Sequence, residues 1–358
     1  MDSIPSKILI RTPNWLGDLV MSTGFLRAVL ETFPDSQVDI ILKSGFETLP
    51  IPHRGEIILF DKNKDSAGKF GKSLRHKNYD YFYVLPPSFS SAWMAFQSKI
   101  PKRIGYAGEY RSFLLTSAKI HEMRPGSLHL LKEYLDLLPI KVEMENYAPR
   151  IEVNNDWAKE QLDSCTFKIP EKFVVFTPGA IYGPSKQWPL EHFRELAKQL
   201  HKAFGYKILL LGTIDDVESG KIIAHNHDWI HNNCGKTTLA QLLAILTKAQ
   251  LLVGNDSGSM HLMAALQRPQ IAVFGSTSPT WTGPINSNAT VMSINLSCSP
   301  CFSRTCRFGH YKCLTQINPE NVFSEVQKYL SQSSLRRQMH WLRQGCHTFL
   351  WPLPCQPP

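Results

Sequence analysis

The stretch LLVGNDSGSMHLMAALQRPQIAVFG, residues Leu251–Gly275, contains the pattern that decides the fold. Two short apolar runs within it, Leu251–Gly254 and Ile271–Phe274, have the length of buried strands. Between them, apolar residues recur at helical spacing until Arg268 and Pro269 end the helix. The stretch therefore predicts one strand–helix–strand unit of a parallel sheet, and with it an α/β fold.

The loop Asn255–Gly258 joins the first of these strands to the helix. Backbone N–H groups at a helix N-terminus have no partner within the helix and lie at the positive end of its dipole, which suits a phosphate. Asp256 and His261 flank the loop with side chains that can bind a sugar or a phosphate. A capped surface loop without a ligand explains the same residues, so both interpretations remain open.

Length and charge limit the classes of protein to consider. The chain has 358 residues, which suits two domains, and its net charge is +9. Such a charge suits nucleic acid, an anionic membrane face or phosphorylated substrates. We expect no nucleic-acid partner, because no run of Lys and Arg is longer than two and no nucleic-acid module is recognisable.

Targeting segments are not recognisable: Met1–Ser6 has no basic residues before Lys7, and no apolar run approaches the about 20 residues of a spanning helix. We therefore expect a cytoplasmic protein, with peripheral contact to the inner membrane as an option. Eight cysteines in a reducing compartment argue against a disulfide framework.

Strands alternate with helices along most of the chain, which is typical of a doubly wound domain. Residues 1–155 contain predicted strands at Lys7–Arg11, Val38–Leu42, Glu56–Phe60, Tyr81–Leu85 and Lys102–Tyr106, with helices after Asp18 and over Ser90–Phe96. Residues 156–330 contain predicted strands at Phe173–Phe176 and Lys207–Leu211, a helix ending at Gly205, a capping box at Thr238 and Gln241, and a last helix over Pro319–Leu330.

The pattern thus predicts two Rossmann-like domains, 1–155 and 156–330, facing a central cleft, with ligands at the carboxyl ends of the strands. The tail 331–358 is basic, then apolar and rich in Pro, and stays unassigned. Two common nucleotide motifs are missing. Gly235, Lys236 and Thr237 resemble the end of a P-loop, but Ile230 stands where a P-loop needs Gly. No G-x-G-x-x-G follows a predicted strand, which argues against a nicotinamide or flavin dehydrogenase.

Asp18 lies where the first strand leads into the first helix. One interpretation is an N-cap, a position that Asp fills well. The other is a general base facing the cleft. We expect the helix N-terminus to lower the pKa of this carboxyl and to keep it ionised at neutral pH.

The loop Thr177–Lys186 begins the corresponding turn of the second domain. Gly179 and Gly183 allow a ligand to approach the backbone closely. Lys186 supplies a point charge that suits a phosphate. The alternative is a surface loop with a solvated lysine.

Four cysteines follow one another at the spacing C-x2-C-x4-C-x6-C, namely Cys298, Cys301, Cys306 and Cys313. Such spacing suits a small structural zinc site and not a catalytic centre. A loop of reduced thiols is the alternative. Arg304, Arg307 and Lys312 also make this segment basic.

Several of these segments together resemble the bacterial lipopolysaccharide heptosyltransferases of glycosyltransferase family 9, most closely the heptosyltransferase II type. The matching pieces, in the family's order, are NWLGDLVMS at Asn14–Ser22, KRIGYAGEYRSFLL at Lys102–Leu115, TPGAIYGPSKQWP at Thr177–Pro189, GNDSGSMHLMAAL at Gly254–Leu266 and CSPCFSRTCRFGHYKCL at Cys298–Leu314. The tail 331–358 matches nothing expected of the family.

The resemblance implies a GT-B fold, in which an N-terminal acceptor domain and a C-terminal nucleotide-sugar domain face each other. It implies inverting transfer of L-glycero-D-manno-heptose from ADP-heptose, without a catalytic metal or other cofactor. The implied acceptor is the first heptose on Kdo–lipid A, at the inner face of the cytoplasmic membrane. A related family 9 transferase with another donor or acceptor, or a non-catalytic nucleotide-sugar-binding protein, are the alternatives.

The resemblance also assigns roles to residues. Asp18 matches the proposed catalytic base. The remaining matches are to donor-binding positions: Thr177, Gly179, Ala180, Lys186, Asp256, Ser257, Gly258 and His261. In a reaction without a metal, Lys186 and the N–H groups of a helix N-terminus would stabilise the charge that develops on the departing diphosphate.

Overall fold

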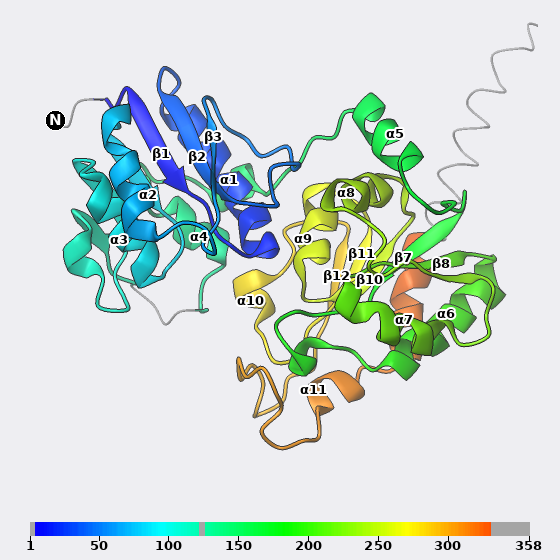
Figure 1. The fold of residues 1–358 in the computed structure, drawn as a ribbon. Coiled ribbons are helices and arrows are strands. Elements are labelled where there is room, and N and C mark those ends of the chain that lie inside the picture. Colours follow the sequence, from blue (N-terminus) through cyan, green and yellow to red (C-terminus); the bar gives the residue numbers. More distant parts are fainter. Residues whose placement is uncertain (1–3, 122–125, 331–358) are drawn as a thin grey trace, which may run out of the picture.

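The computed structural model describes residues 4–121 and 126–330, and these form two halves, each built on a six-stranded parallel sheet (Figure 1). The N-terminal sheet has the order β3 (Ile57–Phe60), β2 (Gln37–Lys43), β1 (Lys7–Arg11), β4 (Tyr81–Val84), β5 (Lys102–Tyr106) and β6 (Ser117–Lys119). The C-terminal sheet has the order β12 (Ala289–Met292), β11 (Gln270–Val273), β10 (Leu252–Asn255), β7 (Phe173–Thr177), β8 (Lys207–Leu210) and β9 (Ile230–Asn232).

The two sheets share one topology. Counted within its own half, each sheet has the order 3-2-1-4-5-6, which is that of the doubly wound fold. The direction of winding reverses between β1 and β4 in the first sheet and between β7 and β10 in the second. The predicted α/β fold with two doubly wound sheets is therefore confirmed.

The faces of the N-terminal sheet are covered by different helices. Ile8 and Ile10 of β1 pack towards α1 (Leu16–Thr32) and α4 (Leu130–Leu135), whereas Leu9 packs towards α2 (Ala67–Ser73) and α3 (Phe89–Ser98). This division follows from the pleat of a strand, which sends successive side chains to opposite faces.

The C-terminal sheet is covered in the same way. Val174 and Phe176 of β7 pack with α6 (Leu190–Phe204) and the helix over residues 319–330, while Val175 lies on the other face with α8 (Leu239–Lys248) and α9 (Gly258–Ala265). The predicted stop of α6 at Gly205 is confirmed, because Gly205 is its C-cap at a φ of 66°. The predicted capping box of Thr238 and Gln241 is confirmed at the start of α8.

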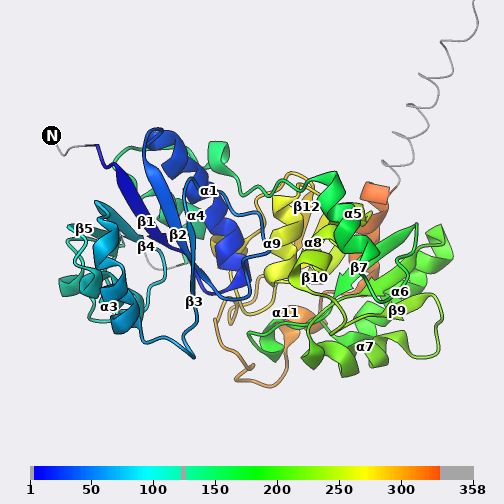
Figure 2. The same cartoon turned by 45° about the horizontal axis from the view of Figure 1, so that its top comes forward.

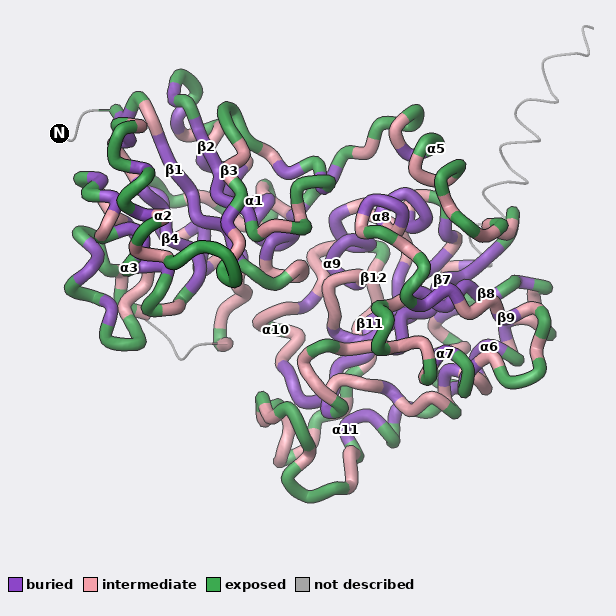
Figure 3. Tube along the Cα trace, viewed as in Figure 1, coloured by how far each residue is buried: buried purple, intermediate pink, exposed green. Residues whose placement is uncertain are grey.

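One buried hydrophobic cluster continues from the first half into the second. It includes Leu19 and Phe25 of α1 together with Leu262 and Met263 of α9. Helices α1 and α9 lie side by side in both ribbon views (Figures 1 and 2). Because the sheet, α4 and α9 all cover α1, every residue from Leu19 to Leu26 is buried, and the burial extends well beyond a single amphipathic stripe (Figure 3).

Short elements escaped the sequence-based prediction. They are β6, β9, β12, α2, α4, α5 (Asn155–Asp163), α7 (Val217–Ala224), α10 (Pro279–Thr282) and α11 (Lys312–Thr315). Edge strands such as β6, Ser-Ala-Lys, have no apolar run to indicate them, because little of their surface is buried. The tail 331–358 lies outside the described residues, and within the described part no helix is long and apolar enough to cross a membrane.

Candidate active site

The predicted site residues lie at the points where the two sheets reverse their winding. Asp18 follows β1, the loop with Lys186 follows β7, and Asp256 follows β10. Ligands of doubly wound sheets bind at these reversal points, outside the carboxyl ends of the strands. The contact between α1 and α9 turns the two reversal points towards each other.

Two glycines allow the N-terminal ends of α1 and α9 to meet. A Cβ at Gly17 would lie 2.6 Å from Cδ2 of His261, and a Cβ at Gly258 would lie 2.7 Å from Cδ2 of Leu16. Both distances are well below a normal carbon–carbon contact. A larger residue at either position would push the two halves apart, so these glycines set the spacing across the site.

Asp18 is the third residue of α1 and faces the second half of the chain. Desolvation by burial raises the pKa of its carboxyl to about 6, the nearby Lys186 acts in the opposite direction, and Asp256 adds to the rise. At a pH one unit above this pKa, about ten carboxylates are ionised for each protonated one. The group is therefore a usable base near neutral pH.

Two sequence-based expectations about Asp18 are wrong. The N-cap of α1 is Trp15, so Asp18 is not the cap. The pKa is raised and not lowered, because the loss of bulk water around a carboxylate outweighs the helix N-terminus and Lys186. The correction makes Asp18 a stronger base than the sequence suggested.

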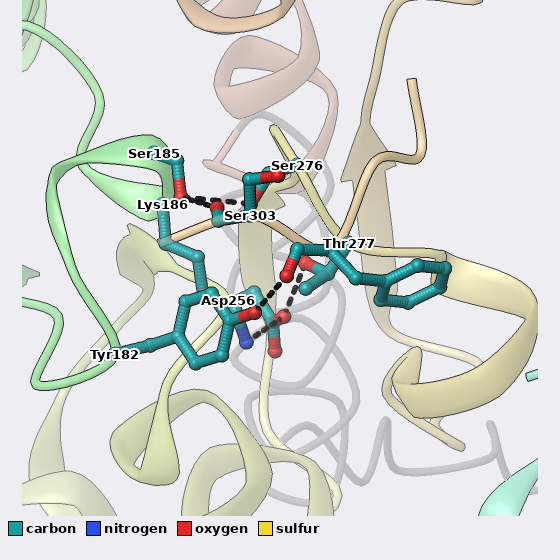
Figure 4. Close-up of polar contacts among 8 residues, drawn as sticks. Tyr182, Ser185, Lys186, Asp256, Ser276, Thr277 and Ser303 are labelled. Atoms are coloured by element: carbon teal, nitrogen blue, oxygen red, sulfur yellow. Dashed lines mark hydrogen bonds and ion pairs between the residues drawn. The ribbon is translucent and has the colours of Figure 1, made fainter. Parts of the chain in front are cut away.

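Lys186 and Asp256 form a buried ion pair. Nζ of Lys186 lies 2.5 Å from Oδ2 of Asp256, and the hydroxyl of Thr277 donates to the same oxygen at 2.6 Å (Figure 4). The two charged side chains are 13% and 4% exposed, which rules out the interpretation of Lys186 as a solvated surface lysine. Nζ also lies 4.8 Å from the ring centre of Tyr182, a cation–π contact.

The loop Thr177–Lys186 is held by the protein around it. Thr177 ends β7, and its hydroxyl is buried without a hydrogen-bond partner in the described part of the chain. A Cβ at Gly179 would lie 2.2 Å from Oδ1 of Asp216, and one at Gly183 would lie 2.5 Å from the carbonyl oxygen of Arg304. The glycines thus permit close packing of this loop against protein groups, and Ala180 between them is half-buried.

Helix α9 begins at Gly258, among the residues for which the sequence predicted donor binding. Ser257 is the N-cap, but its hydroxyl makes no capping bond and lies 2.9 Å from the hydroxyl of Ser259. His261 is buried, and desolvation lowers the pKa of its imidazole to about 4. It is therefore neutral at physiological pH, with one nitrogen able to donate and one able to accept a hydrogen bond.

Sequence reasoning missed the residues that hold this site together. Asn255 is fully buried; its Nδ2 donates to the Pro178 carbonyl at 2.6 Å, and its Oδ1 accepts from the Trp188 amide at 2.9 Å. Thr277, which bonds to Asp256, follows β11, the neighbour of β10. The rule that ligands lie at strand ends would have pointed to Thr277 once the strand order was known.

The four cysteines lie in the segment that packs beside the Lys186 loop. Ser185 donates its amide to the Arg304 carbonyl at 3.2 Å and its hydroxyl to the Ser303 carbonyl at 2.5 Å, and the Tyr182 hydroxyl donates to the Phe302 carbonyl (Figure 4). This segment therefore supports the Lys186 loop through backbone contacts.

The possible zinc site stays a prediction. Sγ of Cys306 lies 4.0 Å from Nδ1 of His310, while Cys313 is buried. Among the described residues, no group of three or more His, Cys, Asp and Glu side chains has an arrangement that holds a metal ion. Burial raises the pKa of the Cys313 thiol, and the nearby thiols of Cys301, Cys306 and Cys298 add to the rise, so the fold brings the four cysteines near one another without a metal-holding arrangement among the described residues.

Comparison with known proteins indicates the family to which this sequence and this site are similar. The sequence model of glycosyltransferase family 9 (heptosyltransferase) matches residues 67–312. Lipopolysaccharide heptosyltransferase 2 of Salmonella typhimurium is 30% identical over 354 residues, which are 92% of this chain and 100% of that protein.

Solved structures give the same picture. The structure of E. coli ADP-heptose LPS heptosyltransferase II is 31% identical with a TM-score of 0.78, covering 92% of this chain and 99% of that one. The E. coli heptosyltransferase WaaC with ADP shares the fold at 20% identity and a TM-score of 0.65, covering 90% and 99%. Two parallel sheets with facing reversal points are thus the GT-B arrangement of these neighbours.

Proposed function

Because the chain belongs to glycosyltransferase family 9, we propose that it transfers L-glycero-D-manno-heptose from ADP-heptose to the first heptose of the lipopolysaccharide inner core. As a member of that family it is a glycosyltransferase that uses a nucleotide-sugar donor. The proposal adds the identity of the nucleotide, the linkage site and inversion at the anomeric carbon.

The observation that carries the proposal is a carboxyl without a bonded cation that lies near a cation site in the other half of the chain. Asp18 has a pKa of about 6 and lies on the N-terminal side, while Lys186 is held in the C-terminal half. An inverting transfer needs these two functions on opposite faces of the sugar. The base removes the proton of the acceptor hydroxyl, and the cation stabilises the leaving diphosphate.

On the donor side, the residues around Lys186 suit a diphosphate. In the structure the charge of Lys186 is balanced by Asp256, so a phosphate that approaches Lys186 competes with a carboxylate. Asp256 is then free to accept hydrogen bonds from donor hydroxyls. The N–H groups at the start of α9 and the neutral imidazole of His261 supply further donors to the phosphates.

Placing the base and the donor site in different halves makes their distance depend on the fit between α1 and α9. Gly17 and Gly258 keep that distance short. Closing the cleft around both substrates would exclude water and so protect the activated donor from hydrolysis. The acceptor carries phosphates and Kdo carboxylates on lipid A, so we place the reaction at the inner face of the cytoplasmic membrane, with the protein peripheral to it.

A transfer assay tests the proposal. The purified chain is offered ADP-heptose or UDP-sugars together with Kdo–lipid A that carries no heptose or one heptose. We expect product only with ADP-heptose and the acceptor that already carries one heptose. Transfer to the heptose-free acceptor would indicate another position in the core, and donor binding without any transfer would indicate a non-catalytic protein. Activity should survive EDTA, because Lys186 and the α9 N-terminus take the role of a metal; strict dependence on Mg²⁺ would contradict this.

A further inference from the structure

Helices α2 and α3 form an outer face of the N-terminal half that combines exposed aromatic and basic side chains. Both ribbon views place this face on the side of the N-terminal sheet that is remote from the C-terminal half (Figures 1 and 2). It contributes nothing to the candidate active site described above. Its composition is unusual for a plain solvent-exposed surface.

The aromatic part is a stripe along α3. Phe89, Trp93 and Phe96 follow one another at helical spacing and are 43%, 36% and 41% exposed, while Met94 and Ala95 on the opposite side are buried. Trp93 and Phe96 stack at 5.6 Å. The next segment adds Phe113, which is 71% exposed, and Tyr110, so that residues 89–113 contain five of the eight large aromatic side chains exposed in the described part of the chain.

Basic side chains lie beside this stripe. Residues 62–103 contain nine Lys and Arg against two Asp and no Glu, and two of the nine pair with carboxylates outside this range, Lys64 with Asp61 and Lys77 with Glu56. Lys69 and Lys72 lie on α2, which packs so closely on α3 that a Cβ at Gly68 would lie 2.8 Å from Nε1 of Trp93. The guanidinium of Arg103 lies 5.8 Å from the ring centre of Phe96.

The cations of this face are available to a partner. Within the described residues, Lys69, Lys72 and Lys99 have no carboxylate partner, and all three are exposed. By contrast, Lys198, Lys221 and Lys328 of the C-terminal half each have a carboxylate three residues away. A surface that keeps its positive charge unpaired favours an anionic partner.

We propose that this face, defined by Lys69, Lys72, Phe89, Trp93, Phe96, Lys99, Arg103 and Phe113, binds the surface of an anionic lipid bilayer. Aromatic side chains prefer the boundary between headgroups and acyl chains, and lysines beside them reach the lipid phosphates. Each Lys or Arg near an anionic membrane adds to the attraction, so a cluster binds reversibly. An exposed stripe of aromatic side chains on a helix suits a bilayer surface, whereas a single nucleic-acid strand is bound along a positively charged groove.

The position of this face in the fold relates bilayer binding to the candidate active site. Helix α3 begins after β4, the strand next to β1, so its first residues leave the same edge of the sheet as the loop before Asp18. A bilayer that contacts the first turn of α3 therefore lies at the edge of the sheet that carries Asp18, on the opposite face of the sheet from α1. This relation rests on the proposed lipid-linked acceptor, whereas bilayer binding itself is measured without any substrate.

Vesicle flotation of the full chain tests the proposal. The vesicles contain either pure phosphatidylcholine, or roughly three parts phosphatidylethanolamine to one part phosphatidylglycerol, at about 50 mM and about 500 mM NaCl. We expect binding to the anionic vesicles at low salt, and about tenfold weaker binding at high salt or with phosphatidylcholine. Equal binding to both kinds of vesicle, or none to either, overturns the proposal.

Matched variants locate the binding surface. Lys69→Glu with Lys72→Glu should weaken partition about tenfold or more, whereas Lys198→Glu with Lys202→Glu, the same charge change on α6, should change it less than about twofold. Phe89→Ser with Phe113→Ser should weaken it about tenfold, against Ile214→Ser with Ile222→Ser as the equally exposed control pair.

Thermal unfolding of each variant is measured in parallel, and only variants with a wild-type midpoint are compared. A control pair that loses as much binding as its test pair contradicts the assignment of the face. Displacement of the protein from vesicles by single-stranded DNA at low micromolar concentration would identify nucleic acid as the occupant instead. If heptose transfer fails but these vesicle results hold, the proposed function is wrong and the membrane face stands.

Discussion

The loop after β1 and the loops after β7 and β10 occupy equivalent positions in two sheets of the same strand order, yet they treat their carboxylates differently. Asp18 is desolvated without a bonded cation, and its pKa rises to about 6. Asp256 is more deeply buried, but Lys186 and Thr277 satisfy it directly. One topology thus supports a reactive carboxyl on one side and a neutralised charge cluster on the other, and the difference comes from the local partners.

The largest expected effect on activity is the loss of the proposed base, Asp18. Asp18→Asn keeps the shape of the side chain and removes its ability to take a proton, so kcat should fall about a thousandfold. Donor affinity, measured by calorimetry with ADP, should stay within about twofold, because the donor side is untouched. Asp215→Asn, an acid on the 3-10 turn before α7, serves as the control. Unchanged turnover in Asp18→Asn would remove the base role.

The second prediction addresses the opposite site. Lys186→Met removes the proposed phosphate cation and should weaken ADP binding by about ten- to a hundredfold, the value of a charge-assisted hydrogen bond. It also leaves Asp256 buried without its cation, so the unfolding midpoint should fall.

A double variant separates the two effects of Lys186. Adding Asp256→Asn to Lys186→Met should restore much of the stability and none of the ADP affinity. If the double variant regains ADP binding, Lys186 serves only to neutralise Asp256. Thr277→Val, which removes one hydrogen bond to Asp256, should have the smaller effect of about fivefold on ADP binding.

The third prediction concerns pH. Because the base must be ionised, kcat/KM should rise about tenfold per pH unit below a pKa of about 6 and level off above about pH 7. Lys186→Met should lower the plateau and also move the rise to higher pH, because the charge of Lys186 holds the pKa of Asp18 down. A profile that levels off near pH 4 would show that Asp18 has an ordinary carboxyl pKa in the working enzyme.

The smallest expected effect is on stability, and its sign distinguishes the two carboxylates. A folded-state pKa above the unfolded value means that the folded protein binds a proton more tightly, so the stability due to Asp18 falls as pH rises from about 4 to about 6. Asp18→Asn should therefore raise the unfolding midpoint by a few degrees at about pH 8 and hardly change it at about pH 4. Asp256→Asn should lower the midpoint at about pH 8, because it unpairs Lys186. Equal signs for both variants would contradict the contrast.

Much of the fold followed from the sequence, because buried parallel strands are apolar runs bounded by turn residues. Nine of the twelve strands were indicated by such runs, whereas β6, β9 and β12 lie at sheet edges and are too short or too little buried to show one. The candidate site was found through loops after strands, which is why Lys186 and Asp256 were named. Their ion pair was not foreseen, since residues 70 positions apart meet only once the strand order is known.

The state of Asp18 could not be predicted, for a related reason. Its position in the chain suggested the dipole of its own helix, but its pKa depends on how much water the other half of the molecule removes. That quantity is set by the approach of α9 to α1, which a single sequence does not contain. Asn255 was overlooked because a buried amide that ties two loops together has no local pattern of its own.

The contact between α1 and α9 also limits how such proteins can be recombined. Gly17 with His261, and Leu16 with Gly258, form two interlocking pairs whose members come from different halves of the chain. A chimera that joins the N-terminal half of one relative to the C-terminal half of another inherits one member of each pair from each parent. Exchange of acceptor specificity by swapping halves will therefore work between parents in which both pairs match, and elsewhere will require the partner positions to be transplanted together.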